Sequence, residues 1–289
     1  MATDRTNQQI KLKDGRMLGY AEYGAAEGKP VFYFHGDPDS RLTAQFFQEP
    51  ATRLNVRIIA VDRPGIGISD FQAGRQMLDW PDDVIELADA LQLNSFSVMG
   101  VSGGGPYVAA CAFRIPQRLT TAAIVSGMGT LDMPRTIVSM SQSARRSLWL
   151  AGRAPWLFRL VLKIFPRNLH RDPDVSFIKS TLPEPDRMTW ERPGVTRVFR
   201  ESMLEAFRRG TRGVARDYAI LARPWGFQLQ DISMEVYLWH GESDKDVPPA
   251  MARYVASAIP NCHAEFLPEE GHFSLLGNHI EEILTVLTS

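Results

Sequence analysis

The chain has few of the residues that build redox or metal centres. Only two cysteines occur among its 289 residues, Cys111 and Cys262. Cys111 lies in an apolar run, and we predict buried free thiols rather than a disulfide. Neither the cysteines nor the six histidines follow a spacing typical of metal ligands. We therefore expect neither a metal nor another cofactor.

Long apolar runs are also missing. No stretch approaches the roughly 18 apolar residues that a membrane-spanning helix needs, and residues 1–13 lack the apolar centre of a signal peptide. The formal net charge is −1, so the overall charge suggests no polyanionic partner. These absences favour a soluble, cytoplasmic protein that binds neither nucleic acid nor membranes. They leave its oligomeric state open.

Charge is distributed unevenly along the chain. Residues 129–226 contain 18 Lys and Arg residues against 9 Asp and Glu residues, so the rest of the chain is acidic. The simpler interpretation is a basic segment that packs on an acidic body. The alternative is a site for anionic substrates, in which arginines of this segment bind a carboxylate or a phosphate.

Short β-rich runs alternate with helical patterns, which predicts an α/β protein with a mostly parallel sheet and crossover helices. Asp14-Gly15 lies between two such runs and predicts a hairpin. Further strands are expected at 30–34, 57–61, 96–99, 121–125, 234–239 and 264–267. Helices are expected at 82–91, 104–113, 249–259 and 273–287.

This alternation stops at about residue 129. The following segment is helical, rich in Arg and interrupted by eight prolines. We predict an α/β core made of residues 1–128 and 229–289. Residues 129–228 are expected to form an inserted helical cap over the carboxyl ends of the strands.

The segment Gly100-Val101-Ser102-Gly103-Gly104 has the spacing G-x-S-x-G and follows an apolar run. A strand that ends there and continues as a helix must turn sharply at Ser102, and the glycines remove Cβ atoms that would collide across the turn. The turn exposes the Ser102 hydroxyl. An alcohol becomes a nucleophile only when a base takes its proton and a third group orients that base.

Two later segments supply candidates for the base and its orienting acid. Asp244 follows the strand expected at 234–239, and His272 follows the strand expected at 264–267. The order Ser, Asp, His suits a strand–turn–helix nucleophile, and open α/β sheets place their sites at the carboxyl ends of the strands. Asp246 is the competing acid.

Four segments in this order resemble the α/β-hydrolase family. They are His35-Gly36 after a strand, residues 62–70 with the pattern D-x-P-G-x-G-x-S, the turn at Ser102, and residues 240–244 followed by Val247-Pro248. The likeness covers nearly the whole chain except the insertion. It implies an α/β-hydrolase fold with an inserted cap and a cofactor-free serine hydrolase.

The resemblance assigns a role to each matching residue. Ser102 would be the nucleophile, His272 the general base and then acid, and Asp244 the carboxylate that orients His272. The family places its acid three residues before the Val-Pro pair, which selects Asp244 over Asp246. The family's dehalogenases and epoxide hydrolases carry a carboxylate at the position of Ser102, which disfavours their chemistry here.

The same resemblance implies an oxyanion hole made by the backbone N–H groups of Asp37 and Gly103. His35 is interpreted as a buried histidine that hydrogen-bonds its own loop. Asp62 is interpreted as structural, because it comes too early in the chain to orient His272.

Aromatic residues are our candidates for contacts with the substrate. They are Phe273, beside the candidate base, and three tryptophans of the predicted cap, Trp149, Trp156 and Trp190. The alternative is that these rings only hold the cap helices together.

We therefore predict a serine hydrolase that cleaves a small-molecule ester through an acyl-enzyme. The alternatives are a proline-iminopeptidase-like enzyme, a C–C bond hydrolase, or a non-catalytic receptor that kept the cleft. Gly103 stands where the iminopeptidases typically have Trp, which disfavours peptidase activity.

Overall fold

The structure, a computed structural model, describes residues 4–130, 140 and 142–289. Its centre is an eight-stranded sheet with the order β1-β2-β4-β3-β5-β6-β7-β8. β2 pairs antiparallel with β1 and with β4, and the remaining pairs are parallel. The strands are β1 (Gln8–Lys11), β2 (Met17–Gly24), β3 (Lys29–Phe34), β4 (Val56–Val61), β5 (Phe96–Val101), β6 (Leu119–Val125), β7 (Val236–Gly241) and β8 (Cys262–Leu267).

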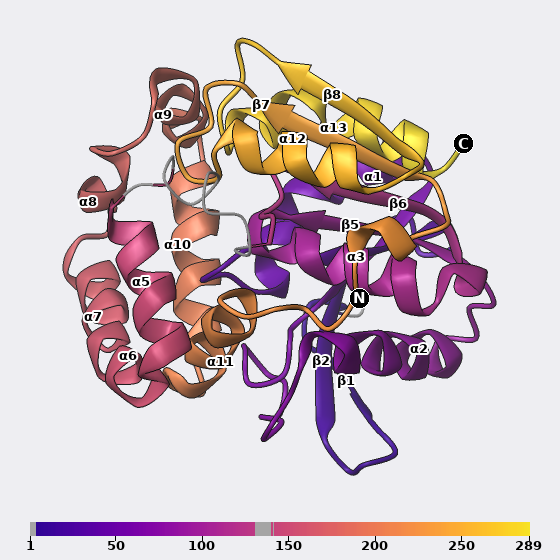
Figure 1. The fold of residues 1–289 in the computed structure, drawn as a ribbon, viewed down its shortest axis with the longest axis horizontal. Helices are drawn as coiled ribbons and strands as arrows, with labels where there is room; N and C mark the ends of the chain where they lie inside the picture. The colour runs from indigo at the N-terminus through magenta and orange to yellow at the C-terminus, as the bar shows by residue number, and fades with distance from the viewer. Residues whose placement is uncertain (1–3, 131–139, 141) are drawn as a thin grey trace.

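Helices cover both faces of this sheet (Figure 1). Side chains of β3 alternate between two hydrophobic clusters: Phe32 and Phe34 pack with α2 and α3, while Val31 and Tyr33 pack with α1 and α13. A strand buried on both faces must be apolar throughout. The helices of the core are α1 (Gln48–Arg53), α2 (Trp80–Ala90), α3 (Gly105–Arg114), α12 (Pro249–Ala258) and α13 (Ser274–Leu287).

The predicted fold class is confirmed, and the expected elements lie within a few residues of their predicted bounds. The helix expected at 82–91 is α2 at Trp80–Ala90, and the strand expected at 234–239 is β7 at Val236–Gly241. The sequence reading missed the 3₁₀ helix η1 (Arg41–Phe47) and the following α1. Both are short, and Pro50 lies inside α1, so their local signal is weak.

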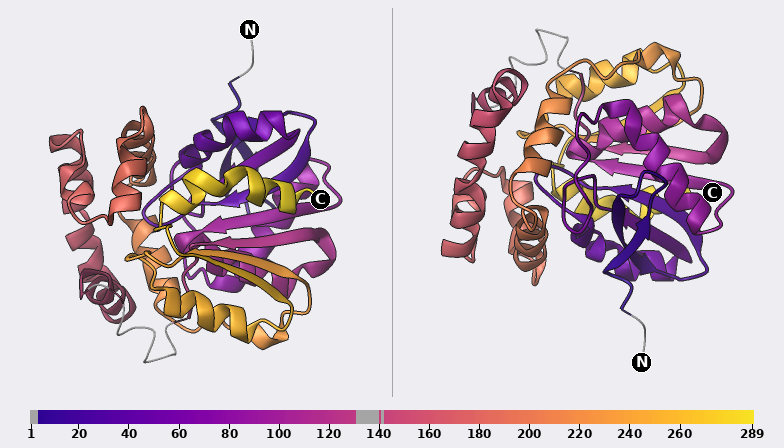
Figure 2. Two further views of the ribbon diagram at one scale, coloured as in Figure 1. Left: turned by 90° about the horizontal axis from the view of Figure 1, so that it is seen from above. Right: turned by 90° about the horizontal axis from the view of Figure 1, so that it is seen from below.

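A block of helices separates β6 from β7. Figure 2 shows most of it as a layer of its own, beyond the end of the sheet to which the parallel strands point. The helices are α5 (Gln142–Arg153), α6 (Pro155–Leu162), α7 (Ile164–Arg171), α8 (Ser176–Lys179), α9 (Glu184–Glu191), α10 (Val195–Ala206) and α11 (Arg212–Leu221). We call α5–α11 the helical insertion. The expected start of the cap adjoins residues 131–139, which lie outside the described residues.

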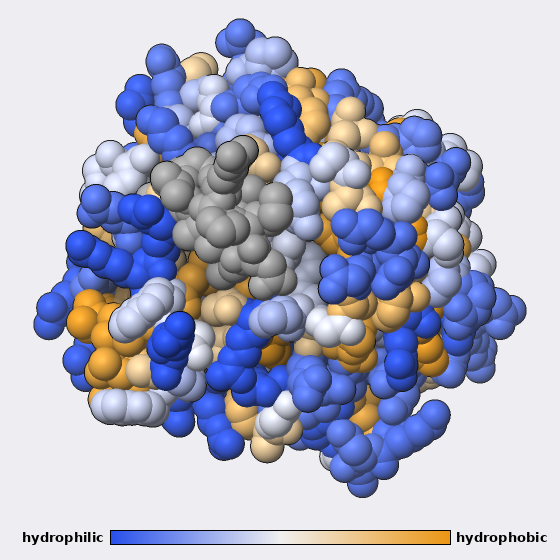
Figure 3. Space-filling model, in the orientation of Figure 1, coloured by the Kyte–Doolittle hydropathy of each residue, from blue (hydrophilic) through white to orange (hydrophobic). Residues whose placement is uncertain are grey.

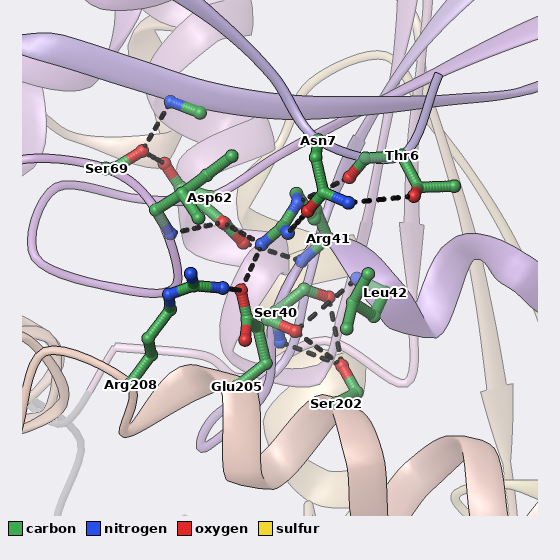
Figure 4. Close-up of polar contacts among 12 residues, drawn as sticks. Thr6, Asn7, Ser40, Arg41, Leu42, Asp62, Ser69, Ser202, Glu205 and Arg208 are labelled. Atoms are coloured by element: carbon green, nitrogen blue, oxygen red, sulfur yellow. Dashed lines mark hydrogen bonds and ion pairs between the residues drawn. The ribbon is translucent and has the colours of Figure 1, made fainter. Parts of the chain in front are cut away.

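Buried polar contacts join the helical insertion to the core (Figure 4). Nη1 of Arg41 donates to Asp62 Oδ2 at 2.7 Å and to Glu205 Oε1, in α10, at 2.8 Å. The hydroxyls of Ser40 and Ser202, also in α10, lie 2.8 Å apart. The loops that follow β3 and β4 are therefore fixed against the helical insertion.

Candidate active site

The turn at Ser102 has the geometry that its sequence predicts. Ser102 has a φ of 54°, a left-handed conformation that a residue with a Cβ rarely adopts. A Cβ on Gly100 would lie 2.4 Å from the carbonyl oxygen of Gly104, and a Cβ on Gly104 would lie 2.1 Å from that of Phe34. Both glycines are therefore needed for β5 to enter the helix that follows.

Asp244 and His272 lie together at the ends of β7 and β8. Nδ1 of His272 is 2.8 Å from Asp244 Oδ2. The other oxygen of Asp244 accepts hydrogen bonds from the backbone N–H groups of Asp246, at 2.9 Å, and Val247, at 2.8 Å. Asp244, rather than Asp246, therefore contacts the imidazole in this structure.

Ser102 and His272 line the same cavity, which has a volume of about 410 Å³. Within the described part of the chain the two side chains make no direct hydrogen bond. Catalytic hydrogen bonds often tighten only when substrate binds. Asp37, Gly103 and Asp246 also line this cavity.

The surroundings of His272 strongly favour its protonated form. Burial alone would lower the pKa of His272, but the charge of Asp244, their hydrogen bond and the charges of Asp246 and Asp186 raise it to about 9. An imidazole acts as a base only when it is neutral.

Asp186, a residue of α9, holds the loop that carries His272. Its carboxylate accepts hydrogen bonds from three consecutive backbone N–H groups, those of His272 at 2.9 Å, Phe273 at 2.8 Å and Ser274 at 2.9 Å. These are donors at the start of α13, where a helix leaves its N–H groups unpaired. The helical insertion thus supplies a cap to a helix of the core and fixes the backbone of the candidate base.

The sequence reading missed Asp186. Its only signal in the sequence is that it is an acid within an Arg-rich segment. The contact joins residues 86 positions apart, and no local pattern predicts such a pairing.

The two expected oxyanion residues touch each other beside Ser102. A Cβ on Gly103 would lie 2.1 Å from Asp37 Oδ2, so the Asp37 side chain fills the space that any larger residue at position 103 would need. Nη2 of Arg63 donates to Asp37 Oδ1 at 2.8 Å and to the carbonyl oxygen of Gly36 at 3.0 Å. Arg63 thereby fixes the loop whose N–H group is the candidate donor.

Aromatic rings form one wall of the cavity. Trp190 and Phe199 stack with their ring centroids 4.7 Å apart, and Phe273 packs edge-on against both. All three line the cavity. Trp190 and Phe273 therefore lie where a substrate contact was expected.

Trp149 and Trp156 do not lie there, which corrects that expectation. Their side chains are 65% and 67% exposed. The neighbouring Leu148 lines the cavity, and successive helix residues point about 100° apart, so Trp149 faces outward. In α6 the inward position belongs to Phe158, which packs on Tyr218 of α11.

The charge of the cavity speaks against the alternative interpretation of the Arg-rich segment, a site for anionic substrates. Among the described residues, no Lys or Arg lines it, whereas Asp37, Asp39 and Asp246 do. Asp39 has no ion-pair partner within the described chain, and burial raises its pKa to about 6. Arg135 of the predicted cap lies outside the described residues.

His35, His240 and the early acid Asp62 have buried polar contacts. His35 is fully buried, and its Nδ1 lies 2.8 Å from the carbonyl oxygen of Gly36, as expected. Asp62 accepts hydrogen bonds from Arg41. His240 lies beside the candidate acid, since its Nε2 is 3.4 Å from Asp244 Oδ2 and 2.9 Å from the carbonyl oxygen of Val247.

The described residues contain neither a disulfide nor a cluster of metal-binding side chains. Cys111 is buried, Cys262 is partly buried, and both thiols are free. The described residues contain no group of three or more His, Cys, Asp or Glu side chains that could hold a metal ion. Of the helices in the described ranges, none has both the length and the hydropathy to cross a bilayer.

Comparisons with known proteins agree with this architecture. The sequence model of the alpha/beta hydrolase family matches residues 31–285. An uncharacterized hydrolase, YcgS, of Bacillus subtilis is 25% identical over 95% of this chain and 94% of its own. A 2-hydroxymuconate semialdehyde hydrolase of Pseudomonas putida is 25% identical over 86% of this chain and 82% of its own.

Solved structures share the fold. A hydrolase from Pseudomonas aeruginosa superposes with a TM-score of 0.73 at 22% identity and full coverage of both chains. A thermophilic esterase from Thermogutta terrifontis superposes with a TM-score of 0.70 at 22% identity, over 98% of this chain and all of its own.

Proposed function

Because the chain belongs to the alpha/beta hydrolase family, we propose that it is a serine hydrolase that cleaves carboxylic esters of small molecules. The strongest support is the meeting of two features in one cavity: Ser102 on its left-handed turn, and His272 held by Asp244 at 2.8 Å. Residues 129–228 would act as the cap that closes this cavity.

In the proposed mechanism, Ser102 Oγ attacks the ester carbonyl while Nε2 of His272 takes its proton. Asp244 holds the opposite nitrogen and stabilises the imidazolium that forms. The backbone N–H groups of Asp37 and Gly103 would donate to the oxyanion, where each donor is worth about 3 kcal/mol of barrier.

The tetrahedral intermediate then collapses. The alcohol leaves with the proton from His272, and the acyl group stays on Ser102. A water molecule repeats the attack with His272 again as base, and the carboxylic acid is released.

The lining of the cavity bears on the choice of substrate. Aromatic and aliphatic side chains suit an apolar acyl or alcohol group. Among the described residues, no Lys or Arg lines the cavity, and two of its three carboxylates, Asp39 and Asp246, have no ion-pair partner, whereas Asp37 pairs with Arg63. A neutral or cationic ester fits this lining better than an anionic one.

The alternatives have less support. A C–C bond hydrolase is suggested by the relative named for a muconate semialdehyde, but a carboxylate-bearing substrate would meet like charge in this cavity. Peptidase activity is disfavoured because this chain has Gly103 where the iminopeptidases typically have Trp, and Asp37 fills the space that a larger side chain would need. A pure receptor has no physical need for the contacts that Asp244 and Asp186 make with the His272 segment.

The test is the turnover of short and medium p-nitrophenyl esters, beside matched amide and diketone panels. Wild type should hydrolyse esters, and Ser102→Ala should reduce turnover to background with an unchanged thermal melt. Ser147→Ala is the matched control, because Ser147 lines the same cavity and has no proposed role. Ester turnover that survives Ser102→Ala would refute the proposal, and turnover confined to diketones would assign the C–C reaction instead.

A further inference from the structure

Exposed apolar side chains gather on one part of the helical insertion. Within the described residues, six of the seven exposed large hydrophobic side chains lie between residues 149 and 164. Figure 3 shows apolar surface over the region of α6 and α7, bordered by hydrophilic residues. The six are Trp149, Trp156, Leu157, Leu160, Val161 and Ile164. We call these six side chains the apolar face.

The spacing of the residues from Trp156 onward explains why they share one side of the chain, while Trp149 comes from the neighbouring α5. From Trp156 the apolar positions recur at i+1, i+4 and i+5, which is one side of α6, and Ile164 begins α7. The opposite side already packs inward, since Phe158 and Leu169 are buried. The helices therefore do not need the apolar face to pack against the rest of the molecule.

The same segment carries an unbalanced positive charge. Residues 142–171 contain seven Lys and Arg residues and neither Asp nor Glu. Six of these cations are exposed, and none has an ion-pair partner among the described residues. They are Arg146, Arg153, Arg159, Lys163, Arg167 and Arg171. We call them the basic rim.

An apolar surface of this kind marks an interaction site, and charge selects the partner. Two copies of this chain paired face to face would bring two basic rims together, which opposes such a dimer. An anionic bilayer satisfies both features at once. Trp and aliphatic side chains enter the boundary between headgroups and acyl chains, while Lys and Arg bind lipid phosphates and carboxylates.

We propose that the apolar face and the basic rim form a docking surface for anionic lipid bilayers. The surface lies flat on the membrane and spans nothing. This inference replaces the sequence-based expectation that membranes are not partners, and it does not depend on the proposed reaction. Because Leu148 and Ser147 of α5 line the catalytic cavity, docking would bring the helical insertion and its cavity close to lipid-dissolved molecules.

The test is co-sedimentation of the full chain with vesicles of phosphatidylcholine mixed with phosphatidylserine, compared with pure phosphatidylcholine. Wild type should bind the mixed vesicles, bind pure phosphatidylcholine weakly, and dissociate as salt is raised. Reversing two charges in Arg159→Glu/Lys163→Glu should weaken binding at least about 25-fold, because each basic residue near such a surface contributes about fivefold. Trp149→Gln/Trp156→Gln should lose binding as well.

The matched controls are charge-reversing and hydrophobic-to-Gln substitutions outside the apolar face and the basic rim. Lys11→Glu/Lys13→Glu alters two exposed lysines at the β1 hairpin, and Met188→Gln alters the exposed hydrophobic residue outside the apolar face. Both should bind like wild type. Thermal melts verify that every variant is folded, and the charge-reversed variant keeps the test decisive if the Trp variant is unstable.

Three results would overturn the proposal. The first is a wild type that does not bind mixed vesicles at low salt, and the second is a Trp variant that binds them as well as wild type does. The third is a stable dimer in sedimentation velocity that Trp149→Gln/Trp156→Gln dissociates, with no vesicle binding. That result would assign the apolar face to a second copy of the chain.

Discussion

At the scale of single residues, the charges around His272 govern its protonation. Burial works against protonation, but Asp244, Asp246 and Asp186 raise the pKa of His272 to about 9, well above its ordinary value near 6.5. We therefore expect the protonated imidazole, which cannot accept a proton from Ser102, to predominate at neutral pH.

We expect kcat/KM to rise tenfold per pH unit below about pH 9 and to level off above it, because only the neutral imidazole is competent. Initial rates of ester hydrolysis across this range measure the profile. A profile that is already flat from pH 7 would contradict the environment described for His272.

The two acids near His272 should differ in their effects. Asp244→Asn should lower kcat by about 10⁴-fold, because an amide at this position favours the wrong tautomer of the imidazole. Asp246→Asn should cost less than about tenfold and move the pH profile to lower pH, since it removes only a nearby charge. Steady-state kinetics of the two variants compare them directly, and the reverse ranking would exclude Asp244 as the orienting acid.

At the scale of elements, the loop after β3 and the turn after β5 fit each other. Position 103 must be glycine because the Asp37 carboxylate occupies the space of a Cβ, at 2.1 Å. Arg63 holds Asp37 in place, so the collision cannot be relieved by a simple side-chain rotation.

Gly103→Ala should therefore displace the oxyanion loop and lower kcat by between about 10² and 10³, the effect of losing one oxyanion donor. The double variant Gly103→Ala/Asp37→Ala removes the collision and keeps both backbone N–H groups. It should recover at least about tenfold of the loss, which a double-mutant cycle measures. Additive losses would mean that the two residues do not act through this contact.

The contact between α9 and α13 leads to a second prediction at this scale. Asp186→Asn cannot accept all three backbone hydrogen bonds and removes a charge near His272. We expect kcat/KM to fall by between about tenfold and 100-fold, with the pH profile shifted to lower pH.

Glu184→Gln is the control for Asp186, because Glu184 is an exposed acid of the same helix. It should leave both the rate and the profile unchanged. A profile that stays in place in Asp186→Asn would reduce Asp186 to a structural role.

The same scale shows what the sequence could and could not predict. The sheet, the turn at Ser102 and the positions of Asp244 and His272 follow from local patterns, because each depends on a strand and the few residues after it. The role of Asp186 and the outward direction of Trp149 depend on how the helical insertion packs on the core. A contact between two distant segments produces no periodic pattern in the sequence of either segment.

At the scale of the whole molecule, buried ion pairs make the helical insertion and the core one unit. Asp217 of α11 is fully buried between two arginines of the core, with Arg63 Nε at 2.7 Å and Arg75 also in contact. Removing one partner of such a network leaves an uncompensated buried charge.

Asp217→Asn should therefore lower the free energy of unfolding by about 3–5 kcal/mol. Wild type should unfold in a single transition in urea, because the helical insertion and the core share these contacts. Tryptophan fluorescence reports on both parts, since Trp80 and Trp239 lie in the core and Trp190 in the helical insertion. Asp174→Asn, at an exposed position, is the control. Two separate transitions in wild type would show that the parts unfold independently.

The central claim is that Ser102 is a nucleophile activated by His272. The most direct measurement is labelling with a fluorophosphonate, followed by mass spectrometry that locates the adduct. We expect one adduct per chain on Ser102, none in Ser102→Ala, and much slower labelling in His272→Ala, with Ser147→Ala labelled like wild type. An adduct on another residue, or a wild type that turns over esters without labelling at Ser102, would contradict the account.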